Sequence, residues 1–157
     1  MKKTLVIGYG NTLRSDDGVG VWIAERLAAL RLPDVDVKTF HQLYPDLAAD
    51  MPPYKTVIFV DASADGEPTA VRKAISPSDQ WPSSNHNISP ELLQQLAWTM
   101  YDAVVNLQVY TVRGENFEFG SALSPAVEKR AADTVILIAS QIQQTRLGAV
   151  GAGFFLN

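Results

Sequence analysis

The chain has 157 residues, of which 46% are hydrophobic, and this length and composition predict one domain with a substantial core. Its formal net charge is −4 with only 13 Lys and Arg residues, so no broad basic surface exists and nucleic acid is not an expected partner. The chain has no cysteine, which removes disulfides, thiolate metal ligands and cysteine nucleophiles, and it has no run of about 18 apolar residues that would predict a membrane span.

The N-terminal segment predicts a strand, a glycine turn and a helix. Residues 4–7 are a short apolar run suited to a buried strand, and glycines follow at positions 8 and 10. Apolar side chains then recur at helical spacing, at Val19, Trp22, Ile23, Leu27 and Leu30. The start Met1-Lys2-Lys3 does not form a signal peptide, and we expect a cytoplasmic protein.

Two adjacent carboxylates, Asp16 and Asp17, follow the glycine turn, where a phosphate-binding loop would need the opposite charge. Gly8 and Gly10 match the start of a dinucleotide fingerprint, but Leu13 occupies its third glycine position. A nucleotide site is therefore disfavoured. One alternative is that Ser15, Asp16 or Asp17 caps the helix, and another is that one aspartate caps while the other faces a cleft.

The middle of the chain alternates strands and helices. Residues 35–40 alternate as in a half-buried or edge strand, and residues 45–51 suit a short helix. The continuous apolar run 56–60 predicts a central parallel strand that ends at Asp61. Residues 70–75 predict another strand, which a long polar loop follows.

The C-terminal half continues this alternation. Ser89 and Pro90 open a helix that runs to about Tyr101, residues 107–112 form a strand, and Ser124-Pro125 open a last helix that ends near Gln144. The sum predicts an α/β domain over residues 1–146, with an open, mostly parallel sheet of about five strands and helices on both faces. Residues 147–157 form a tail, flexible or docked through its phenylalanines.

Three loops should meet beyond the carboxyl ends of the strands, where open α/β sheets bind ligands. They carry the Asp16-Asp17 pair, Asp61 and His86. Carboxylates and an imidazole suit a divalent transition metal such as nickel or zinc. The alternatives are that Asp61 binds loop amides, that His86 is a solvated loop residue, and that His41 lines the same cleft or packs on a helix.

Four segments together resemble one family, the maturation endopeptidases of nickel-iron hydrogenases. They are the motif from Gly8 to Gly20, Val60-Asp61-Ala62, the segment from His86 to Pro90, and the later stretch from Phe117 to Pro125. The serine-nucleophile elbow and the His-Glu-x-x-His zinc helix of conventional hydrolases are absent from the sequence.

The resemblance implies a three-layer αβα sandwich whose metal contacts fall on Asp17, Asp61 and His86. In the family the first of these positions is often Glu, so Asp17 is a shorter carboxylate. Some members carry a histidine directly after Ser-Pro, where this chain has Glu91, so Glu91 and His41 are rivals of His86. Gly10, Asn11, Asp16, His41 and Glu91 are the candidates for the substrate cleft.

The resemblance also implies a function: an endopeptidase that removes the C-terminal extension of a hydrogenase large-subunit precursor after nickel has been inserted. Nickel would arrive with the substrate, no resident zinc is expected, and the metal would either polarise the scissile carbonyl, activate water, or only position the substrate. The expected partner is the precursor, with no nucleic acid and no membrane. The alternatives are a non-enzymatic nickel-binding assembly factor and a nucleotide-binding oxidoreductase built on Gly8-x-Gly10.

Overall fold

The computed structural model of the chain describes residues 3–68, 70–78, 81–82 and 87–154. Within these residues, five strands form one sheet in the order β2-β1-β3-β5-β4. The strands are β1 (Thr4–Tyr9), β2 (Val35–Phe40), β3 (Thr56–Ser63), β4 (Val71–Ile75) and β5 (Asn106–Arg113). All neighbouring pairs are parallel except β4 and β5, which are antiparallel, so the expected mostly parallel sheet is confirmed.

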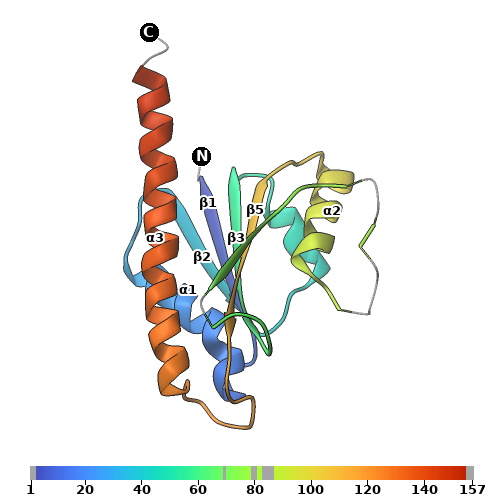
Figure 1. Cartoon of the computed structure of the whole chain (residues 1–157). Coiled ribbons are helices and arrows are strands. Elements are labelled where there is room, and N and C mark those ends of the chain that lie inside the picture. The colour runs from blue at the N-terminus through green and yellow to red at the C-terminus, as the bar shows by residue number, and fades with distance from the viewer. Residues whose placement is uncertain (1–2, 69, 79–80, 83–86, 155–157) are drawn as a thin grey trace.

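Helices cover both faces of the sheet, as Figure 1 shows. One face packs against α1 (Val19–Ala29) and α3 (Pro125–Phe154), and its core includes Ile23, Ile58 and Ile138. The other face packs against α2 (Pro90–Tyr101) and the short 3-10 helix η2 (Pro45–Asp50) through a separate core. The molecule is therefore the three-layer αβα sandwich that the sequence predicts.

The last helix is longer than expected. It continues past Gln144 to Phe154, so the first residues of the expected tail are helical. Figure 1 shows this end of α3 reaching beyond the sheet, on the side of the chain's N-terminus. Gly148 lies inside the helix, where a glycine costs about 1 kcal/mol relative to alanine but does not stop the helix. No helix in the described ranges combines the length and the apolar character needed to cross a membrane.

Helix α1 lies unusually close to the ends of β1 and β3, because glycines remove the side chains between them. A Cβ added at Gly20 would clash with the carbonyl oxygen of Val60, and a Cβ added at Gly8 would clash with that of Gly20. This contact fixes the first turns of α1 against the carboxyl ends of the two central strands. It also fixes the Asp16-Asp17 pair, the acidic motif, which directly precedes α1.

We therefore predict that Gly20→Ala lowers the free energy of unfolding by about 2 kcal/mol or more, because α1 must move away from β3. The matched control is Gly148→Ala. It lies in a helix with no atom within 4 Å of the added Cβ, and it should be neutral or stabilise the protein by up to about 1 kcal/mol. Denaturant unfolding of both variants measures the difference, and equal stabilities would contradict the tight packing at Gly20.

Candidate functional site

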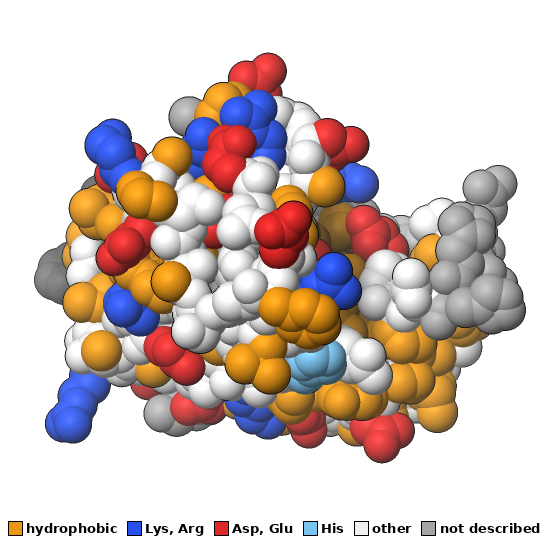
Figure 2. Space-filling model, turned by 90° about the horizontal axis from the view of Figure 1, so that it is seen from below, with side chains coloured by type: hydrophobic (Ala, Val, Ile, Leu, Met, Phe, Trp, Pro, Cys, Tyr) orange, Lys and Arg blue, Asp and Glu red, His pale blue; other side chains and the backbone are white. Residues whose placement is uncertain are grey.

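The candidate site lies at the reversal point of the sheet. The chain leaves β1 to form β2 on one side and returns as β3 on the other, so a crevice opens beyond the carboxyl ends of β1 and β3. An open pocket of about 290 Å³ occupies this crevice. Its lining includes Tyr9, Gly10, Asp17, His41 and Asp61. Figure 2 looks onto this edge, where acidic side chains lie among hydrophobic ones.

Asp17 reaches the pocket from the 3-10 helix η1 (Ser15–Gly18), which precedes α1. Gly10 has a φ of 142°, a conformation that L side chains rarely adopt, and an added Cβ would clash with the Asp17 carbonyl oxygen. The backbone amide of Asn11 donates a hydrogen bond of 2.7 Å to Asp17 Oδ2. The glycine therefore lets the turn fold back onto Asp17, and the amide fixes the direction of its carboxylate.

Asp61 ends the apolar run of β3 and faces the same pocket. The pKa of the Asp61 carboxyl is raised to about 6. Burial is the largest cause and the nearby charge of Asp17 adds to it, while hydrogen bonds from the Ala62 amide and the Tyr9 hydroxyl oppose the shift. Burial and the Asp61 charge also raise the pKa of Tyr9, which stays a neutral donor. Asp61 thus exchanges its proton close to neutral pH, as catalytic carboxyls often do.

Asp16 takes a different place from its neighbour. Its side chain is fully buried and lies outside the pocket lining. Its carboxylate accepts bonds from the amides of Glu115 and Asn116, both 2.8 Å, and from the amide and hydroxyl of Ser124, both 2.7 Å. Burial alone would raise the pKa of Asp16, but these bonds outweigh it and lower the pKa. Asp16 therefore anchors the connection between β5 and α3.

The capping alternative for the acidic motif is wrong. The residue at the N-cap of α1 is Gly18, and no side chain accepts a capping bond there. Arg14 takes the corresponding place for η1, again without a side-chain capping bond. Asp16 and Asp17 instead use their carboxylates in two different directions, Asp16 toward the β5–α3 connection and Asp17 toward the pocket.

The remaining predicted residues are distributed around the pocket. His41 is exposed and lines it directly after β2. Glu91 lies in the first turn of α2, outside the lining, and forms an ion pair of 3.6 Å with Lys73. His86 lies outside the described residues, although Asn87, which follows it, lines the pocket. Asn11 contributes its amide to Asp17 rather than its side chain to the lining.

The structure adds lining residues that the sequence motifs did not indicate. Tyr9, Gln42 and Asn87 all face the pocket. Tyr9 is the last residue of β1, and this place at the carboxyl edge of the sheet was the one feature of the sequence that could have indicated its role in the lining. Among the described side chains, no three of the types His, Asp and Glu come together closely enough to form a metal site. Asp17 and Asp61 are the two carboxylate side chains in the pocket lining.

We predict that Asp61→Asn stabilises the metal-free protein at pH 7 by about 2 kcal/mol. Because the folded-state pKa is raised, the wild-type protein loses stability as the pH rises from about 4 through about 6, whereas the amide does not titrate. The advantage of the variant should vanish at pH 4. Urea unfolding at the two pH values checks this, and a variant that is less stable than wild type at pH 7 would contradict the burial of Asp61.

The matched control is Asp16→Asn, for which the expected sign is the opposite. Its lowered pKa means that the ionised form stabilises the fold above the ordinary Asp pKa and that this stabilisation is lost as the pH falls. At pH 7 the amide variant should be less stable by about 3 kcal/mol, because buried donors lose their acceptor.

The fold of this chain is similar to that of several proteins of known structure. No family model matches the chain, and no curated protein matches it. The structure is similar to that of the NiFe hydrogenase maturation protease HycI from Thermococcus kodakarensis KOD1, with a TM-score of 0.69 and 22% identity over 88% of this chain and 91% of that one. It is also similar to the hydrogenase maturating endopeptidase HybD from E. coli, with a TM-score of 0.69 and 23% identity over 91% of this chain and 93% of that one.

A third similar structure is the hydrogenase 2 maturation peptidase from a Thaumarchaeota archaeon, with a TM-score of 0.66 and 22% identity over 90% of this chain and 98% of that one. Each match spans nearly the whole of both chains. The chain therefore has the fold of solved hydrogenase maturation peptidases.

Proposed function

We propose that this protein is a cytoplasmic endopeptidase that removes the C-terminal extension of a nickel-loaded NiFe-hydrogenase large-subunit precursor. The observation that carries the proposal is the shared pocket of Asp17 and Asp61 at the reversal point of the sheet. It is supported by the fold, which the chain has in common with proteins described as hydrogenase maturation peptidases. It is also supported by the sequence resemblance carried by the motif from Gly8 to Gly20.

The chemistry of the pocket fits a nickel ion that belongs to the substrate. Two carboxylates and no thiolate form a modest site that leaves coordination positions free for the precursor's own ligands. A metal held there orients the precursor chain and polarises any carbonyl oxygen bound to it. Because a ligating carboxyl must be deprotonated, burial of Asp61 makes its contribution weaker below its pKa of about 6.

The third contact from this chain is assigned to His86. Asn87 and Ile88 follow it directly and line the pocket, which supports a position for this segment at the site. His41 also lines the pocket, whereas Glu91 lies outside it and faces Lys73. Of the two rivals, His41 has the stronger geometric support.

The direct test incubates the purified protein with candidate large-subunit precursors, with and without nickel, and measures the product mass. We expect shortening by the C-terminal extension only when the precursor contains nickel. Binding of the precursor without any mass change would instead identify a non-enzymatic assembly factor. Prior chelation of the protein alone, followed by removal of the chelator, should leave processing unchanged, and restoration by zinc after such treatment would reveal a resident metal.

In this assay, Asp17→Asn should slow processing by at least about 100-fold, because it removes a charged oxygen donor while the Asn11 amide still has an acceptor. Asp61→Asn should have a similar effect despite its higher stability. The control is Asp133→Asn on the exposed surface of α3, which should process at the wild-type rate. Full activity of a folded Asp17→Asn variant would remove Asp17 from the site.

The histidine assignment is tested separately. His86→Ala should weaken nickel-dependent processing more than His41→Ala, and Glu91→Gln should have the smallest effect of the three. Mass measurements over time give the three rates under the same nickel loading. Equal rates for wild type and His86→Ala would move the ligand role to His41 or Glu91.

A further inference from the structure

Residues 10–18, which include Asp16 and Asp17, lie between two hollows, and we call this segment the ridge. On one side, Gly10 and Asp17 line the candidate pocket. On the other side, Thr12, Ser15 and Gly18 line a second open hollow of about 270 Å³. The far wall of the second hollow includes Trp22 and Leu123 among its apolar members. The proposed function uses the first hollow with Asp17, and it leaves Leu13 and the second hollow without a role.

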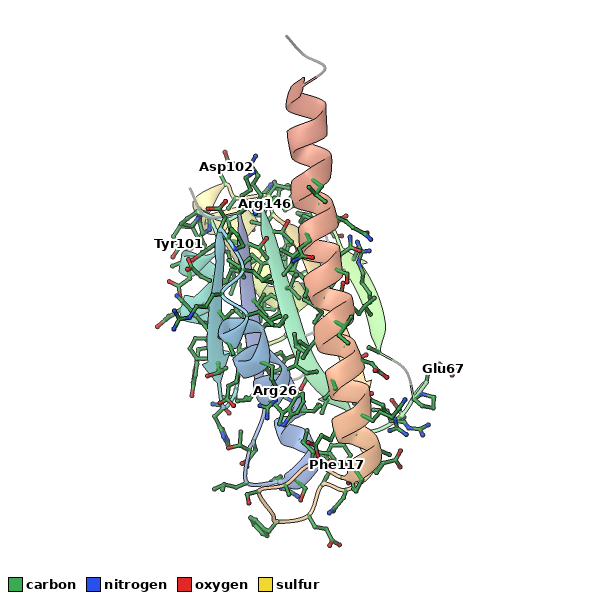
Figure 3. All side chains as sticks on the ribbon, turned by 90° about the vertical axis from the view of Figure 1, so that its left-hand side faces the viewer. Arg26, Glu67, Tyr101, Asp102, Phe117 and Arg146 are labelled. Carbon is green, nitrogen blue, oxygen red and sulfur yellow. The ribbon has the colours of Figure 1, made fainter. Side chains whose placement is uncertain are left out.

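Two large apolar side chains are exposed to solvent here, one on the ridge and one on the neighbouring connection between β5 and α3. Leu13, on the ridge, is 65% exposed, and Phe119, on the connection between β5 and α3, is 89% exposed. Figure 3 shows this connection, marked by Phe117, beside the start of the α1 segment beyond the sheet edge. We call Leu13 and Phe119, with Arg14 between them, the ridge patch. Burial of a phenylalanine is worth about 2 kcal/mol, and the fold does not use it at Phe119.

Hydrogen bonds hold the backbone that carries the ridge patch. The Gly120 amide donates to the Leu13 carbonyl at 3.0 Å, and the Ser15 amide donates to the Gly120 carbonyl at 2.8 Å. The Ser15 hydroxyl donates to the Glu118 carbonyl at 2.8 Å, and the Arg14 guanidinium lies 5.8 Å from the centre of the Phe119 ring. Because this backbone is already held, less of it has to be ordered on association, and aromatic and arginine side chains are the types enriched in binding hot spots.

We propose that the ridge patch docks the folded body of the same protein whose chain enters the candidate pocket. The inference rests on the proposed function, so this protein is the hydrogenase large-subunit precursor. Leu13 is only two residues from Asn11, whose amide binds Asp17, so a body seated on the patch lies beside the carboxylates. The second hollow receives a side of the same partner, and the partner straddles the ridge.

The surroundings favour this occupant over a membrane. Glu118 directly precedes Phe119, Glu25 lines the second hollow, and the chain carries a net charge of −4, so an anionic lipid surface would be repelled. A protein surface with a complementary apolar centre and cationic rim fits both the patch and its acidic surroundings.

The test measures kcat and KM for nickel-loaded precursor with Phe119→Ser and Leu13→Ser. We expect KM to rise about tenfold or more in each variant, with kcat within about twofold of wild type, because the pocket is untouched. Thermal unfolding should be unchanged, since both side chains are exposed. The matched control is Ile136→Ser on α3, a residue 66% exposed, which should behave as wild type.

The outcomes separate the two levels of the argument. If wild type cleaves the precursor and Phe119→Ser keeps the wild-type KM, the docking role is overturned while the proposed function stands. If sedimentation shows a wild-type dimer that Phe119→Ser dissociates without a change in KM, the patch belongs to a second copy of this chain. If wild type cleaves no precursor, both the proposed function and the docking role are overturned.

Discussion

The hydrogen bonds to the Asp16 carboxylate hold the carboxyl edge of this molecule together. Four donors from the connection between β5 and α3 meet on one buried side chain that follows β1 by a few residues. This joins the first and last parts of the chain across the sheet. The neighbouring Asp17 is thereby turned toward β3, and Phe119 is held at the surface. One aspartate therefore orders the loops so that the other can face the pocket.

The pocket itself is arranged at a cost in stability. Asp17 and Asp61 lie close enough for the charge of one to raise the pKa of the other, and burial of Asp61 adds to this. Two carboxylates in such a place repel each other until a cation or a proton neutralises them. Tyr9 and the Ala62 amide reduce the cost but do not remove it. Local instability of this kind is common where a site is kept for function rather than for stability.

Much of the architecture could be predicted from the sequence, because hydrophobic periodicity and helix-start residues fix elements locally. The central strand from residue 56 and the Ser89-Pro90 helix start are both observed, although β3 continues past Asp61 to Ser63. The continuation of the last helix to Phe154 was missed, since its glycines weaken the helix without a proline to end it. The different positions of the Asp16 and Asp17 side chains could not be predicted from the sequence either, because the donors that bind Asp16 lie about a hundred residues later in the chain.

The chemistry of the pocket depends most on the closeness of Asp17 and Asp61 and on the burial of Asp61. A carbon-detected magnetic resonance titration of the Asp61 carboxyl in metal-free protein measures this directly, in wild type and in Asp17→Asn. We predict a midpoint near pH 6 in wild type, and a lower midpoint when the Asp17 charge is removed. An ordinary aspartate midpoint of about 4 that does not change in the variant would contradict the paired site.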